Sequence, residues 1–251
     1  MYLKVEDEYH CSKRLLALAT VFFLFILTQA PGWCLIVTFT SLSNQIRYHQ
    51  SGIDRYLKAA AATIYANTGL TSDMSVAVVL HPDGSTFRQH GFPQWSSAVY
   101  RDGEIHLRNP YALLNKGILE NTVSHELFHA IIDHHDISLP VWFEEGFANY
   151  LFPVSLPETN LVLKNQRDFR DQALFFYVQS RDAVMNLLKG KTRGEIQYFF
   201  LLCRKTGFPT AFDNCFQATI LSSNLFTTEA SQGQKGEIEP GKPGSMIFNW
   251  N

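Results

Sequence analysis

The stretch Ser124–Tyr150 reads SHELFHAIIDHHDISLPVWFEEGFANY, and the rest of the chain is best understood from it. It begins with an HExxH motif, in which His125 and His129 are four positions apart and Glu126 follows the first histidine. Residues four apart on a helix lie one turn above each other, so both imidazoles can reach one cation. The motif therefore predicts a helix with two ligands of a Zn²⁺ ion and an acidic residue beside them.

The third ligand has two candidates, and they indicate different classes of enzyme. His135 occupies the last position of an HExxHxxGxxH pattern, but the glycine position of that pattern holds Ile132, which is poorly suited to a left-handed break. The other candidate is an acidic residue on a second helix. Leu139–Tyr150 is expected to be that helix, with Ser138 as its N-cap and Pro140 in its first turn.

An HExxH motif followed by Trp142-x-x-Glu-Gly-Phe-Ala148 resembles the gluzincin metallopeptidases, and most closely the small peptidase MA-like proteins, or minigluzincins. The resemblance implies that Glu145 is the third zinc ligand. Glu144, about 100° away around the helix, is expected to face elsewhere. Gly146 has no side chain, which would let the two helices that carry the ligands approach closely.

The same resemblance implies an α+β, zincin-like fold in which a small N-terminal sheet packs on the HExxH helix and the C-terminal half is helical. A zinc-bound water, deprotonated by Glu126, would then hydrolyse a peptide bond. Tyr177 aligns with a family tyrosine and is the candidate donor to the oxyanion. Asn149 is expected to hold a ligand histidine by its second ring nitrogen. The strand Glu104–Arg108 is the candidate edge for pairing with extended substrate.

The remaining elements follow from periodicity and turn residues. Apolar spacing predicts a helix that Gly69 ends, a Val-rich strand, a hairpin around Asp102-Gly103, and helices in the C-terminal part. His81 falls in a predicted turn, where a solvated side chain is expected. The predicted helices are Ile53–Thr68, Asn165–Lys189, Glu195–Lys205 and Thr210–Ile220, and the predicted strand is Met74–Leu80.

Composition limits the class of protein. The chain has 251 residues, 46% of them hydrophobic, which is enough for a substantial core in one domain. Its net charge of −2 gives no electrostatic case for binding nucleic acid. The four cysteines do not form a disulfide scaffold, but Cys203 and Cys215 fall in neighbouring predicted helices, where they can either form a bridge or stay as two thiols.

The two ends of the chain are expected to lie outside the fold. Residues 1–32 resemble a signal peptide or membrane anchor, because Lys13-Arg14 precedes the apolar run Leu15–Leu27. An anchor that spans residues 15–39 is the alternative, and either one places the catalytic domain, residues 42–226, outside the cytoplasm. Residues 227–251 have the composition of a disordered tail.

The sequence thus predicts an exported zinc metallopeptidase that acts on a peptide or protein substrate. Two alternatives stay open at this point. One is a non-catalytic binding protein that retains the zincin cleft. The other is a membrane-anchored structural protein in which the motif arose by chance.

Overall fold

In the computed structural model the described residues are 34–41, 49–153 and 169–223, so the predictions for the leader and the tail lie outside them. The chain divides into two compact units, Met1–Cys34 and Leu35–Asn251. All of the elements below belong to the second unit. The structure is α+β, as the sequence predicts, with a small sheet and mostly helical content.

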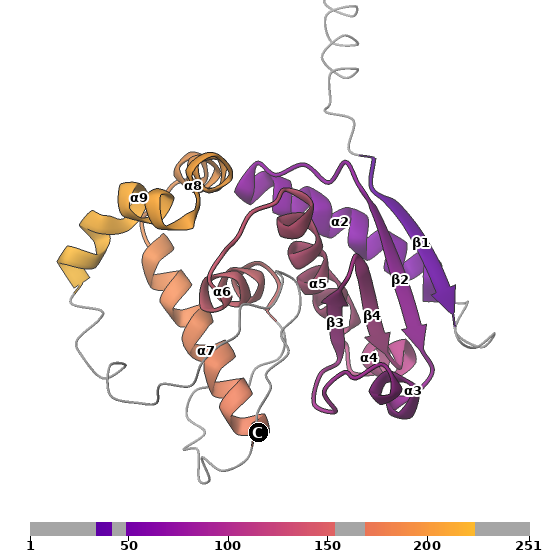
Figure 1. The fold of residues 1–251 in the computed structure, drawn as a ribbon. Coiled ribbons are helices and arrows are strands. Elements are labelled where there is room, and N and C mark those ends of the chain that lie inside the picture. Colours follow the sequence, from indigo (N-terminus) through magenta and orange to yellow (C-terminus); the bar gives the residue numbers. More distant parts are fainter. Residues whose placement is uncertain (1–33, 42–48, 154–168, 224–251) are drawn as a thin grey trace, which may run out of the picture. The chain divides into compact units, whose positions relative to one another are not determined.

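A four-stranded sheet forms the N-terminal part of this unit (Figure 1). Its strands are β1 (Ile36–Ser41), β2 (Ser75–His81), β3 (Ala98–Arg101) and β4 (Glu104–Arg108), in the order β1-β2-β4-β3. Strands β1, β2 and β4 are parallel, and β3 is antiparallel to β4. The predicted hairpin is confirmed, because Asp102 and Gly103 both take positive φ between β3 and β4.

The position of β4 corrects the prediction for Glu104–Arg108. This strand pairs with β2 on one side and with β3 on the other, so neither of its edges is open to a peptide. The edge strands are β3, on the side of this hairpin, and β1 on the other side. A hairpin signal in a sequence does not show which of its two strands pairs with the rest of the sheet. Here β2, a strand from earlier in the chain, pairs in parallel with β4.

Strand β1 and helix α3 were not predicted. Strand β1 begins six residues before the predicted start of the domain, within the span of the alternative anchor, and its pairing with β2 places that stretch in the sheet. Helix α3 (Gly84–Gln89) begins at the last residue of the predicted turn, and Pro82 and Asp83 keep a bend before it. Its N-cap Asp83 accepts hydrogen bonds from the backbone N–H groups of Ser85 and Thr86, and these bonds lower the pKa of Asp83.

Two helices connect the sheet to the C-terminal part. Helix α5 (Leu119–His134) contains the HExxH motif and packs against β3 and β4, and α2 (Gln50–Thr68) packs against α5 and α8. The predicted end of α2 is confirmed, since Gly69 has φ 72° and its N–H donates to the carbonyl of Tyr65. The short helix α4 (Pro110–Asn115) precedes α5.

The C-terminal half consists of α6 (Val141–Leu151), α7 (Phe169–Leu188), α8 (Arg193–Thr206) and α9 (Phe208–Ser223). Helix α6 begins after Pro140 with no side-chain cap, so the predicted cap at Ser138 is wrong. An aromatic cluster joins α5, α6 and α8, with ring centroids 4.9–6.0 Å apart in neighbouring pairs. Its fully buried members are Phe128, Phe143, Phe147, Phe199 and Phe200.

The described part of the chain has no disulfide. Cys203 is a buried thiol and Cys215 a half-buried one, on the adjacent helices α8 and α9. Burial and the neighbouring Cys215 raise the pKa of Cys203 to about 12, so this thiol is unreactive at neutral pH. None of the helices that the structure describes has the length and apolar character needed to cross a bilayer.

Gly146 permits a close approach between helices, although the partner is not the predicted one. A Cβ at this position would overlap the carbonyl oxygen of Ser180 and would lie 2.8 Å from Val184 Cγ2. Both of these residues are on α7, and neither belongs to α5, the helix with the HExxH motif. The glycine therefore sets the contact between α6 and α7.

We predict that Gly146→Ala destabilises the protein by about 1–3 kcal/mol, because a backbone carbonyl cannot rotate away from the new methyl group. Gly194→Ala is the matched control: Gly194 is also helical, but a Cβ added there would meet no atom within 4 Å. That control is expected to be neutral or to stabilise by about 0.5–1 kcal/mol. Urea denaturation measures both, and equal stability for the two variants would contradict the close contact.

Two histidines are buried where β2 and β4 pair. His81 is fully buried, not solvated as predicted, and its Nε2 lies 3.1 Å from Nδ1 of His106. His106 Nε2 in turn lies 3.4 Å from a carboxylate oxygen of Glu104. Burial lowers the pKa of both histidines to about 4; the neighbouring His90 adds to the effect on His81, and His81 and His90 add to that on His106.

Between pH 6.5 and 4 the two histidines therefore bind fewer protons in the folded state than in the unfolded state. Their contribution to the free energy of unfolding is complete at neutral pH and is lost on acidification. We expect a loss of roughly 2 kcal/mol per histidine between about pH 7 and pH 5. The double variant His81→Leu, His106→Leu is expected to flatten the dependence, and the exposed His134→Gln to leave it unchanged. Urea denaturation at several pH values across this range measures the slope; an unchanged slope in the double variant would refute this origin.

Candidate metal centre

Three candidate ligands converge where α5 and α6 meet. His125 Nε2 lies 3.1 Å from Oε2 of Glu145, and His129 Nε2 lies 3.4 Å from Oε1 of the same carboxylate. One ligand atom from each residue falls within 4.8 Å of the other two. His125 and Glu145 are both buried, so the group is enclosed by protein on most sides. Two imidazoles and a carboxylate are the donor set of many catalytic zinc sites.

Local sequence explains this convergence. The motif spacing puts the two imidazoles one turn apart on α5, and their ring centroids lie 4.9 Å apart. Phe128, between them in sequence, points into the core and stacks on Phe147 of α6, with centroids 5.4 Å apart. That stacking fixes α6 against α5, so that Glu145, two residues before Phe147, faces the histidines.

Glu144 also belongs to this site, contrary to the prediction that it faces elsewhere. Its Oε1 lies 2.7 Å from Nδ1 of His129. The rotation of about 100° between adjacent helical residues takes Glu144 away from the cation position but brings it to the far nitrogen of the same imidazole. A proton on Nδ1 that is donated to Glu144 leaves Nε2 free to bind a metal. The sequence signal was available, since a ligand histidine needs such an acceptor.

Asn149 does not hold a ligand histidine, contrary to the prediction. The amide nitrogen of Asn149 donates to the carbonyl of Glu145 in its own helix, at 2.9 Å. Among the described residues, His125 Nδ1 and Asn149 Oδ1 are both buried without a hydrogen-bond partner. In the absence of a cation, His125 Nε2 must donate its proton to Glu145. A metal ion on Nε2 would require the tautomer with its proton on Nδ1, and that proton would need an acceptor.

Charge in the site favours a cation. Burial by itself lowers the pKa of His129, but Glu145, Glu144 and Glu126 outweigh it and raise the pKa to about 10. Burial likewise opposes ionisation of Glu145, yet His129 and His125 lower its pKa below the ordinary value. The proton on His129 thus compensates the surrounding carboxylates. A divalent ion bound to the three ligands would replace that proton.

Glu126 is held by the edge strand of the sheet. The backbone N–H of Tyr100 donates to its Oε2 at 2.7 Å, and the hydroxyl of Tyr100 donates to Asp133 at 2.6 Å. Tyr100 of β3 therefore forms hydrogen bonds with two residues of α5 that are about two helical turns apart. Burial raises the pKa of Glu126 even though the two histidines oppose this shift. A partly buried carboxylate with a raised pKa is suited to accept a proton.

Tyr177 of α7 lies close enough to the carboxylates of Glu145 and Glu126 to be influenced by both. Burial, with these two charges adding to it, raises the pKa of Tyr177 well above its ordinary value, so the hydroxyl keeps its proton and can donate it. The close contact of Gly146 with Ser180, three residues further along α7, holds this part of the helix against α6. The structure thus brings the predicted Tyr177 to the site.

His135 does not belong to the site. Helix α5 continues unbroken past Ile132, which is buried in the core, and His135 follows as its C-cap. The Nε2 atom of His135 lies 2.8 Å from the carbonyl oxygen of Thr71. A β-branched residue kept the helix regular where the alternative pattern needs a glycine, so the chain does not turn back toward the two ligand histidines.

No protein-family model matches this chain, and no significant match was found among curated proteins or solved structures. The site is therefore defined by its geometry as a buried His₂-Glu group that can hold a metal ion.

We predict that Glu144→Gln weakens zinc affinity by roughly 10- to 100-fold, because an amide orients the His129 imidazole less firmly than a carboxylate. Competition titration against a chromophoric chelator measures the dissociation constant. Glu120→Gln, an exposed residue in the first turn of α5, is the control and is expected to bind zinc as the unmodified protein does. Equal affinity for all three proteins would remove Glu144 from the site.

Proposed function

We propose that this protein is a zinc-dependent metallopeptidase of the gluzincin type with a zincin-like arrangement of its sheet and helices. The observation that supports this most strongly is the convergence of His125, His129 and Glu145 within 4.8 Å, beside the partly buried carboxylate of Glu126 on the helix of the two histidines. A chance HExxH motif on a core helix has no reason to meet a carboxylate from a second helix.

The two imidazoles and the Glu145 carboxylate would hold the ion, and Glu144 would orient one of the imidazoles. Zinc in such a site supplies Lewis-acid chemistry, since it polarises a peptide carbonyl and lowers the pKa of water toward neutrality. The raised pKa of His129 fits a cation at this position, because the surrounding carboxylates already favour a positive charge there.

The chain's own groups account for the proton transfers of hydrolysis. Glu126 takes a proton from the water that adds to the peptide carbonyl, and it later gives that proton to the departing amine. The backbone N–H of Tyr100 keeps one oxygen of Glu126 in place, and the other oxygen is left for the water. Tyr177 keeps its proton at neutral pH and would donate a hydrogen bond to the oxyanion.

The edge strand β3 would bind the substrate backbone. In the antiparallel ladder, Arg108 N–H donates to the carbonyl of Ser97, and successive residues of β3 alternate between facing β4 and facing outward. The N–H of Tyr100 faces outward, where it meets Glu126. An extended peptide along this outer edge would therefore pass next to the general base.

We expect Glu126→Gln to lower peptide hydrolysis by about 10²- to 10⁴-fold while zinc binding is retained, because the variant keeps the three ligands but cannot accept a proton. Cleavage of an unstructured protein substrate, followed by mass spectrometry with and without a zinc chelator, measures this loss. Glu120→Gln is again the control and should cleave normally.

Two results would refute the proposal. If the purified protein contains no stoichiometric zinc, the HExxH motif has no metal-binding role. If zinc is bound but neither the chelator nor Glu126→Gln changes any cleavage, the protein is a binding protein with a zincin-like site.

A further inference from the structure

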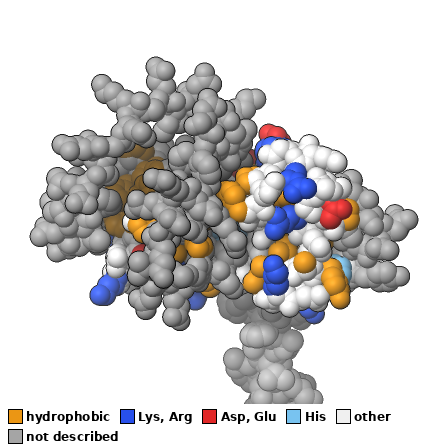
Figure 2. All heavy atoms as spheres, turned by 90° about the horizontal axis from the view of Figure 1, so that it is seen from below, with side chains coloured by type: hydrophobic (Ala, Val, Ile, Leu, Met, Phe, Trp, Pro, Cys, Tyr) orange, Lys and Arg blue, Asp and Glu red, His pale blue; other side chains and the backbone are white. Residues whose placement is uncertain are grey.

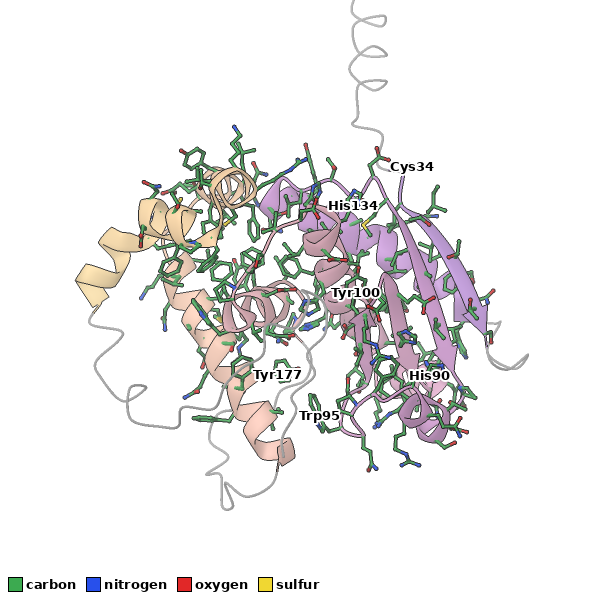
Figure 3. All side chains as sticks on the ribbon, viewed as in Figure 1. Cys34, His90, Trp95, Tyr100, His134 and Tyr177 are labelled. Atoms are coloured by element: carbon green, nitrogen blue, oxygen red, sulfur yellow. The ribbon has the colours of Figure 1, made fainter. Side chains whose placement is uncertain are left out.

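Trp95 lies in the loop between α3 and β3 and faces Tyr177 of α7. Their ring centroids are 6.4 Å apart and the ring planes are inclined at 62°, an edge-to-face arrangement. The two residues belong to different parts of the fold, the sheet and the C-terminal helices, and they point toward each other in Figure 3. Trp95 is nevertheless 38% exposed, so part of its ring is open to a ligand.

The loop that carries Trp95 is fastened on both sides of the indole. Before it, the guanidinium of Arg101 donates to the carbonyl of His90 at 2.8 Å and lies 4.2 Å from the ring centroid of Phe92. Arg108 donates to the carbonyl of Gln94, and Ser96 N–H donates to the carbonyl of Pro93. Because its backbone is already fixed, the indole loses little freedom when a ligand covers it.

Two arginines on this end of the molecule, Arg101 and Arg108, thus hold the loop. Figure 2 views the molecule from the end where α3 lies, and it shows Lys and Arg side chains beside hydrophobic ones on the described part of that face. Arg101 and Arg108 extend from β3 and β4 to carbonyl groups of the loop. A partly exposed indole on a fixed backbone is suited to be a contact residue, because tryptophan is enriched among the residues that carry most of the binding energy at interfaces.

Tyr177 links the indole to the candidate metal centre. Its hydroxyl end is within the influence of Glu145 and Glu126, whereas its ring is in edge-to-face contact with Trp95. One aromatic ring therefore separates Trp95 from the reacting groups. An extended peptide advances about 3.3 Å per residue. A side chain that reaches the indole must then come from a residue close to the bond that is cleaved.

We propose that Trp95 and Tyr177 form a subsite for a large apolar side chain (Phe, Tyr, Leu or Met) within two residues of the scissile bond. This inference rests on the proposed peptidase function and names its substrate class. A ring or branched chain against the exposed face of Trp95 completes its burial. A third aromatic ring can also make edge-to-face contact with the existing pair, and each such contact is worth about 0.5–1.5 kcal/mol.

Paired peptides test the subsite. A series of identical peptides with either Phe or Ala at each position around the cleaved bond gives the ratio of kcat/KM for Phe over Ala. At one position this ratio should be well above one in the unmodified protein. Trp95→Ala should lower it by about threefold to tenfold, and Trp95→Phe should largely restore it. Tyr111→Ala, at an aromatic residue that is 61% exposed on α4, is the matched control and should not change it.

A binding measurement separates this proposal from the peptidase proposal. Zinc-loaded Glu126→Gln protein is titrated with the same peptides, and tryptophan emission and calorimetry report the dissociation constants. The Phe peptide should bind about threefold to tenfold more tightly than the Ala peptide, and Trp95→Ala in this background should remove the difference.

If no peptide is cleaved but the difference in binding is found, the subsite stands and the hydrolase does not. An equal affinity for both peptides, or a Phe preference that survives Trp95→Ala in a protein with an unchanged melting temperature, would overturn the subsite.

Discussion

The buried carboxylate of Glu145 is the constraint on which the rest of this structure depends. An ionised carboxylate in an apolar interior is costly unless opposite charge and hydrogen bonds compensate it. Here the compensation comes from two imidazoles on another helix, at 3.1 and 3.4 Å, and they lower its pKa. The contact between α5 and α6 must therefore be exact, and the stacked rings of Phe128 and Phe147 beside it supply a rigid apolar support.

A second constraint acts through backbone atoms. Glycine at position 146 lets α7 approach α6 until the carbonyl of Ser180 occupies the space that a Cβ would need. Because Tyr177 is on α7, this approach also fixes its position relative to Glu145, the residue that precedes the glycine. The candidate metal ligands and the proposed oxyanion donor are thus connected through one small residue. The glycine next to Glu145 sets the contact of α6 with α7, and not the contact of α6 with α5.

Much of the candidate site could be predicted from the sequence because helical spacing is local. His125 and His129 follow from i,i+4 geometry, and Glu145 and Tyr177 follow from resemblance to a motif. Glu144 was misjudged because rotation around one helix does not say what a second helix places on that side. The edge strand was misassigned for a related reason: the pairing of β2 with β4 is a long-range contact that no local pattern encodes. The pairing of His81 with His106 depends on the same long-range register.

The sheet and the helices contribute different groups to the proposed chemistry. The helices supply the ligands and Tyr177, whose positions depend on side-chain packing. Strand β3 supplies a backbone N–H for Glu126, and the loop before β3 supplies Trp95. Because Tyr100 also binds Asp133 of α5 through its hydroxyl, the strand cannot shift along the helix without losing both hydrogen bonds. The proposed general base and the proposed substrate contact are therefore held in one register, so a peptide that contacted the indole would also lie against Glu126.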